Sequence, residues 1–107
     1  MKIAEIDVFP ASLPYKQDFK ISRGSVGSRA QGAPHIYVRV RADNGLEGWG
    51  EARPSHRWSY ETQETVVSTL ENYLIPAVLG REPWDLQGLH EVMDREIAPC
   101  VTTGQPV

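Results

Sequence analysis

One ten-residue segment organises the chain: Asp43-Asn44-Gly45-Leu46-Glu47-Gly48-Trp49-Gly50-Glu51-Ala52. It follows residues 35–42, in which apolar and polar side chains alternate without a break. Asn44-Gly45 is the dipeptide typical of a two-residue type I′ turn, in which both central residues need positive φ. The segment therefore predicts a β-hairpin. In its first strand the alternation puts Ile36, Val38, Val40 and Ala42 on one face and Tyr37, Arg39 and Arg41 on the other.

The second strand of this hairpin has an unusual composition. Gly48 and Gly50 share one face, and Glu47, Trp49 and Glu51 share the other. Two glycines on one side of a strand weaken it, and they indicate that a ligand or another backbone comes close. Packing of a helix against the glycine face within the same domain is an equally good explanation.

The chain before the hairpin predicts one more strand and a long loop. In residues 2–12, Ala4, Ile6 and Val8 alternate with Ile3, Glu5, Asp7 and Phe9. Pro10 and Pro14 limit further pairing, since proline cannot donate to a sheet ladder. Residues 15–34 have no periodicity and are rich in glycine and serine. Loops of about twenty residues are uncommon in compact domains and often act as lids, although plain surface disorder is the alternative.

The chain after the hairpin predicts two amphipathic helices, at residues 61–75 and 84–97. The first carries an apolar stripe and should end at Pro76, which disfavours helical backbone at Ile75. The second ends before Pro99, and the tail 101–107 has no periodic pattern. The expected fold class is α+β: a three-stranded antiparallel sheet (2–12, 35–42 and 46–52) followed by a helical hairpin.

Composition and charge exclude several classes of protein. With 107 residues and 40% hydrophobic content, the chain can build one modest domain. Transmembrane and signal-peptide patterns are missing, and the single Cys100 fits a small apolar residue in a reducing cytoplasm. Residues 1–60 carry nine Lys/Arg against six Asp/Glu, whereas residues 61–107 carry two against eight. Such an acidic second half argues against nucleic-acid binding, which needs a basic stripe.

The sequence supplies no catalytic or metal-binding set of its own. Glu47 and Glu51 lie about 13 Å apart along one strand, too far to act as a pair on one bond. His35, His56 and His90 lack metal-ligand spacing, and no carboxylate cluster suits magnesium. We therefore assign neither catalytic residues nor metal ligands.

The hairpin segment resembles a family motif. Residues 45–54, Gly-Leu-Glu-Gly-Trp-Gly-Glu-Ala-Arg-Pro, are similar to the G-x-x-G-W-G-E-x-x-P pattern of the enolase superfamily, and of its mandelate racemase/muconate lactonizing enzyme group. Agreement extends to Met1-Lys2-Ile3 through Leu13-Pro14, to Tyr60-Glu61-Thr62, and to the connection from Leu74-Ile75-Pro76 to Pro83. The resemblance spans residues 1–107 as the N-terminal capping domain.

The resemblance implies a catalytic (β/α) barrel C-terminal to this domain, which is absent from the sequence. Such a barrel needs about 250 residues, and it could act in cis or in trans. It would hold Mg²⁺ and the acid/base residues that abstract a proton next to a substrate carboxylate. The complete enzyme would then be a cytoplasmic, homo-oligomeric isomerase or lyase: a racemase, epimerase, cycloisomerase or dehydratase.

The resemblance implies that this domain contributes to substrate specificity. Residues 15–34 and 53–60 would close over the barrel mouth, and together they carry six Lys/Arg against a single Asp. That balance suits a small anionic carboxylate substrate. The expected substrate-binding residues are Phe19, Ile21, Arg23, His56, Arg57, Trp58 and Tyr60. The alternative is a free-standing, non-catalytic module that binds a partner protein or a small ligand.

Overall fold

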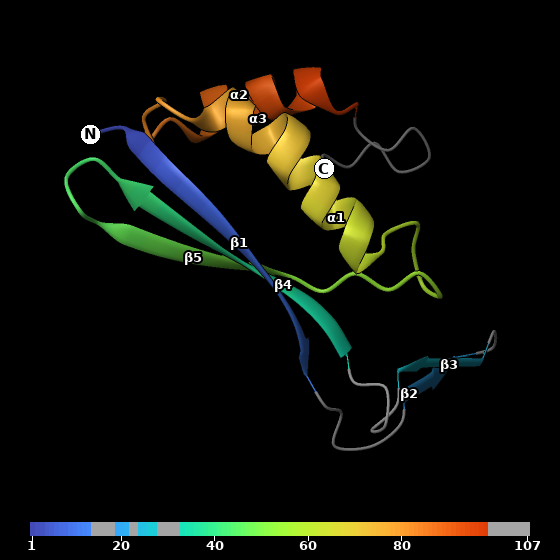
Figure 1. The fold of residues 1–107 in the computed structure, drawn as a ribbon. Helices are drawn as coiled ribbons and strands as arrows, with labels where there is room; N and C mark the ends of the chain where they lie inside the picture. Colours follow the sequence, from blue (N-terminus) through green and yellow to red (C-terminus); the bar gives the residue numbers. More distant parts are fainter. Residues whose placement is uncertain (14–18, 22–23, 28–32, 99–107) are drawn as a thin grey trace.

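The structure is a three-stranded antiparallel sheet with helices over one face (Figure 1). This computed structural model describes residues 1–13, 19–21, 24–27 and 33–98. The sheet order is β1 (Ile3–Leu13), β4 (Ala33–Ala42), β5 (Glu47–Ala52), so that β4 is central. The α+β fold predicted from the sequence is confirmed. Cys100 and the tail 101–107 lie outside the described residues.

The β4–β5 hairpin is present, but its turn differs from the predicted type I′. Gly45 has a φ of 91°, whereas no described residue other than glycine has positive φ. The Gly45 N–H donates to the Ala42 carbonyl, and the Ala42 N–H donates to the Leu46 carbonyl. These bonds make a three-residue connection, a type I turn closed by a left-handed glycine. In the Asn44-Gly45 pair, therefore, only Gly45 has positive φ, a conformation that residues with a side chain rarely adopt.

Strand β1 departs from simple alternation near its start. The register shifts between Ile3 and Glu5 opposite β4, so that Ile3 turns into the core. Ile3 is only 5% exposed, although the alternation had placed it with the polar side chains. Pro10 pairs with Ile36, and the strand continues to Leu13. Pairing through Pro10 is tolerated because β1 is an edge strand.

The segment expected to be an unstructured loop contains a small hairpin. β2 (Phe19–Ile21) pairs antiparallel with β3 (Gly24–Gly27) as a separate two-stranded sheet. Figure 1 shows this hairpin beyond the ends of β1 and β4, away from the β4–β5 turn. The prediction of twenty residues without secondary structure was therefore wrong.

The first helical segment continues through the proline that was expected to end it. α1 (Gln63–Thr69) passes into a π-helical turn, η1 (Leu70–Leu74), and then into α2 (Ile75–Val78). The Ile75 N–H donates to the Leu70 carbonyl, five residues back. This wider turn gives room for the Pro76 ring, which would clash with the carbonyl four residues back in a regular helix. Ile75 keeps helical backbone angles as a result.

The second helical segment completes a thin core. α3 (Leu86–Glu96) begins at Asp85, whose carboxylate accepts a hydrogen bond from the Gly88 N–H at 3.1 Å. Buried Ile3, Val78 and Val92 meet between sheet and helices, with Ile6, Val40, Ala77, Leu89 and Met93 packed around them. Strand β5 contributes no residue to this cluster. No helix in the described part of the chain is long and apolar enough to cross a membrane.

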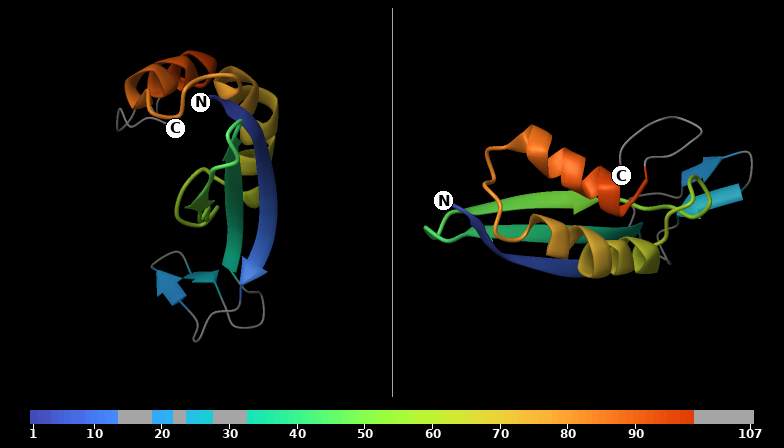
Figure 2. Two further views of the ribbon diagram at one scale, coloured as in Figure 1. Left: turned by 90° about the vertical axis from the view of Figure 1, so that its left-hand side faces the viewer. Right: turned by 90° about the horizontal axis from the view of Figure 1, so that it is seen from above.

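The glycine face of β5 is open. A Cβ atom built at Gly48 or Gly50 would meet no described heavy atom within 4 Å. Neither a close backbone nor a tightly packed helix therefore explains these glycines among the described residues. Of the helices, α1 contacts β4 and β1, and in the view from above α3 crosses over the C-terminal end of β5 (Figure 2, right).

Candidate functional site

The predicted substrate-facing residues of the second loop, 53–60, project from a compact turn. Strand β5 ends at Ala52, and Pro54 is fully buried, so the loop is anchored at its start. The Ser55 carbonyl accepts hydrogen bonds from the N–H groups of Trp58 (3.1 Å) and Ser59 (2.7 Å). The Ser59 hydroxyl donates to the same carbonyl at 3.1 Å. Three bonds to one carbonyl hold the loop in a single turn.

This turn directs four of the predicted site residues outward. His56 and Arg57 are exposed. Trp58 is 66% exposed and Tyr60 89% exposed. With this exposure, Trp58 is not part of the core among the described residues. Large aromatic side chains beside cationic ones on an exposed turn can cover an anionic ligand with an apolar part.

The other predicted site residues lie on the small hairpin. Phe19 and Ile21 belong to β2, of which the backbone is described, and Arg23 lies outside the described residues. In Figures 1 and 2 the β2–β3 hairpin and the 53–60 loop lie at the same end of the three-stranded sheet. The fold thus brings the two predicted segments together at that end.

The outer face of the sheet carries a charged and aromatic ladder that sequence reasoning did not find. Arg39 on β4 donates to Asp7 on β1 through Nη2 (2.7 Å) and Nε (3.2 Å). Its guanidinium also lies 5.3 Å from the ring centre of Phe9 and 5.8 Å from that of Trp49. The alternation of the sequence placed Arg39 on this face. Its pairing with Asp7, 32 residues earlier in the chain, follows only from the register between β1 and β4.

A second cluster lies on the same face, where β5 meets the 53–60 loop. His35 Nδ1 is 2.9 Å from Glu51 Oε2, and the His35 and Tyr37 rings stack at 6.1 Å. Hydrogen bonds from His35 and then from Tyr37 hold the pKa of the Glu51 carboxyl below its usual range. The bond to Glu51 in turn raises the pKa of the Tyr37 hydroxyl. Glu51 thus links the end of β5 to the central strand.

The lowered pKa of Glu51 predicts a loss of stability in acid. A carboxyl whose pKa is depressed by folding contributes stability above its unfolded pKa, and this is lost as the pH falls through the folded value. We expect His35→Gln to raise the pKa of Glu51, measured from its side-chain carboxyl ¹³C shift between pH 2 and 7. The control, His90→Gln on α3, should leave the Glu51 titration unchanged. An unaltered titration in the His35 variant would contradict the assigned cause.

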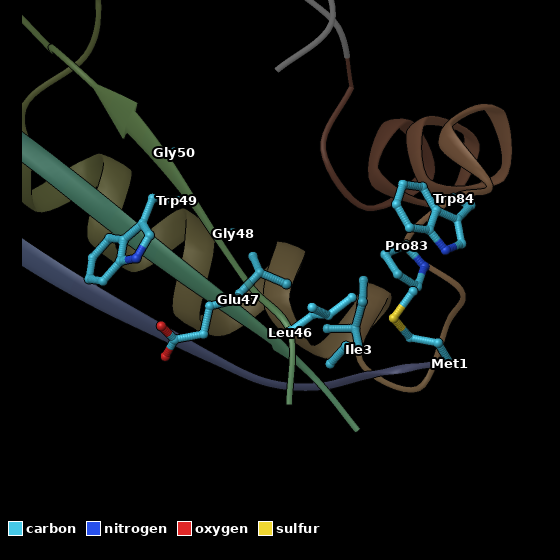
Figure 3. Close-up of a pocket in the computed structure, with 11 residues that line it drawn as sticks. Met1, Ile3, Leu46, Glu47, Gly48, Trp49, Gly50, Pro83 and Trp84 are labelled. Carbon is cyan, nitrogen blue, oxygen red and sulfur yellow. The ribbon is translucent and has the colours of Figure 1, made fainter. Parts of the chain in front are cut away.

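An apolar hollow lies at the opposite end of the sheet, beside the β4–β5 turn (Figure 3). It measures about 470 Å³ and lies between the hairpin and the connection from α2 to α3. Met1, Leu46 and Trp84 line it, and Glu47 is its single carboxylate. Nowhere in the described part of the chain do three His, Cys, Asp or Glu side chains gather as metal ligands. The described residues therefore do not fit a magnesium site.

Comparisons with known proteins identify the family. Residues 3–105 match the model of the mandelate racemase/muconate lactonizing enzyme N-terminal domain. The chain is 33% identical to the N-succinyl-L-Arg/Lys racemase of Bacillus cereus over 91% of its length and 25% of that protein's length. The crystal structure of that racemase superposes with a TM-score of 0.83 over 92% of this chain and 26% of that one.

A second solved structure agrees. The dipeptide epimerase of Enterococcus faecalis, complexed with Mg and the dipeptide L-Leu-L-Tyr, is 30% identical, with a TM-score of 0.79 over 89% of this chain and 25% of that one. The chain spans about a quarter of the length of these relatives. It belongs to the mandelate racemase/muconate lactonizing enzyme family and corresponds to the N-terminal domain of that family.

Proposed function

We propose that this domain caps the active site of a magnesium-dependent isomerase or lyase and helps to select its substrate. The exposed side chains of the 53–60 loop, at the same end of the sheet as the β2–β3 hairpin, are the observation that carries the proposal. Similar relatives are racemases, epimerases and cycloisomerases. Catalysis would take place in a (β/α) barrel, with which this domain would act in cis or in trans.

The substrate would be a small carboxylate. N-succinylated amino acids, dipeptides and chloromuconate, named for three relatives, all carry carboxylate groups. Arg57 would orient such an anion through charge-assisted hydrogen bonds, and Trp58 and Tyr60 would exclude water from its apolar part. Magnesium, held by the barrel, would stabilise the negative charge formed when a proton next to the carboxylate is removed.

The test uses the enzyme that contains both domains. We expect Trp58→Ala and Tyr60→Ala each to lower kcat/KM about tenfold, or about 1.4 kcal/mol. Unfolding free energies should change by less than about 0.5 kcal/mol, since both side chains are exposed. Tyr73→Ala, which removes a half-exposed ring from η1, is the matched control and should leave kcat/KM unchanged. Unchanged kinetics in both loop variants would remove the loop from substrate selection.

The second candidate function is a free-standing module that binds a partner protein or a small ligand. The exposed Phe9 and Trp49 of the outer sheet face favour it. The intact mass of the native protein separates the two. A chain about four times longer, as in the relatives, supports the capping role, and a native 107-residue chain without a barrel partner supports the module.

A further inference from the structure

The two ends of the 53–60 loop are held by one residue of the central strand, His35. Before the loop lies Glu51, whose Oε2 is 2.9 Å from His35 Nδ1. After it lies Gln63, at the start of α1, whose Nε2 donates to the His35 main-chain carbonyl at 3.1 Å. His35 thus contacts one end of the loop through its side chain and the other through its main chain. Compact surface loops whose ends lie close together are frequently functional.

The side-chain bond reinforces the point at which β5 passes into the loop. The β4–β5 ladder ends at the pair Ile36–Ala52, and within the described sheet β5 pairs with a strand on one side only. His35 stands one position beyond that last pair on β4, and its bond to Glu51 joins the two strands where the ladder ends. Tyr37, the direct partner of Glu51 in the ladder, donates to the same carboxylate. Cross-strand side-chain pairs of this kind stabilise a sheet.

The main-chain bond holds the other end of the loop. The Gln63 amide also donates to the Ala11 carbonyl at 3.0 Å, so the entry to α1 is held against β4 and β1 together. Between the two ends, Arg57 and Trp58 are exposed on the turn that closes at the Ser55 carbonyl. The direction in which this turn points therefore depends on where its two ends are held.

We propose that His35 is a positioning residue for the substrate: it holds both ends of the 53–60 loop and so sets the direction of Arg57 and Trp58. This inference rests on the capping function proposed above, in which those side chains meet the substrate. His35 acts through Glu51 and the loop, since its side chain is 18% exposed and bonds to that carboxylate. An ionised carboxylate can only accept a hydrogen bond, so the role of His35 requires a donor at the position of Nδ1.

The first test measures the order of the loop in the ¹⁵N-labelled 107-residue chain. Backbone order parameters at Arg57 and Trp58 should be about 0.85, as in a rigid backbone, and should fall below about 0.6 in His35→Leu. His35→Asn should restore them, because the Asn amide nitrogen is as many bonds from the backbone as Nδ1 and donates in its place. His90→Leu, at an exposed position of α3, is the control and should leave the loop rigid. Unchanged order in His35→Leu, or equal loss in the Asn and Leu variants, would overturn the proposal.

The second test uses the enzyme that contains both domains. We expect His35→Leu and Glu51→Leu each to raise KM about tenfold with little change in kcat, and His35→Asn to bring KM back to within about twofold of the original. Comparison with Trp58→Ala separates this inference from the capping function. If Trp58→Ala lowers kcat/KM and His35→Leu does not, the positioning role is wrong and the capping function stands. If neither variant alters the kinetics, both are wrong.

Discussion

Replacing Ile36 with alanine is expected to destabilise the domain by about 2–5 kcal/mol, the range for truncating a fully buried aliphatic side chain. Ile36 lies on the central strand, pairs with Pro10 and Ala52, and has 0% exposure. Its truncation would leave a cavity at a fully buried position of the central strand. Because few large apolar side chains are buried in the described part of the chain, other contacts offer little compensation.

Urea denaturation measures this effect. Ile36→Val should cost about 0.5–1.5 kcal/mol, which gives a graded series at one position. Leu86→Ala is the control: Leu86 is 65% exposed at the start of α3, and its change should stay within about 0.5 kcal/mol. A cost below about 1 kcal/mol for Ile36→Ala would show that the centre of the sheet is not packed as the structure has it.

The sequence predicted the strands and their faces because alternation is a local signal. Predictions from the sequence were wrong where a neighbouring part of the structure changes the conformation that a residue would adopt by itself. Pro76 ends a regular helix, but the π-helical turn before it opens the space its ring needs. Ile3 was placed on the polar face because a register shift opposite β4 cannot be read from one strand alone. The type I′ turn was wrong because Asn44 does not take positive φ here.

In the candidate site, too, local features could be predicted from the sequence, whereas features that depend on neighbouring elements could not. The exposed aromatic and basic residues of the 53–60 loop followed from an aperiodic segment rich in such residues. Their position beside the β2–β3 hairpin depends on the topology of the whole sheet. The partners of Arg39 and of Glu51 depend on strand register, which single residues do not encode. The glycines of β5 were noticed from the sequence, but only the structure distinguishes open space at Gly48 and Gly50 from tight packing.

Removal of the Gln63 amide is expected to cost about 1–3 kcal/mol, the scale for leaving partly buried polar groups unsatisfied. Gln63 is the first residue of α1, and its Nε2 donates to the Ala11 carbonyl at 3.0 Å and to the His35 carbonyl at 3.1 Å. Ala11 and His35 face each other across β1 and β4. A single side chain thus fastens the helical layer to two strands, close to the end where the candidate site lies.

Gln63→Ala should lower the free energy of unfolding and speed amide exchange in the first turn of α1. Gln87→Ala is the matched control, since Gln87 makes one exposed bond of 3.4 Å to Glu91 on its own helix, and its loss should cost less than about 0.5 kcal/mol. Gln63→Glu separates geometry from hydrogen bonding, because a carboxylate of the same length can only accept where both carbonyls need a donor. It should cost at least as much as alanine. Equal stability of the Gln63 and Gln87 alanine variants would mean that water replaces the amide, and that α1 is held by its apolar contacts alone.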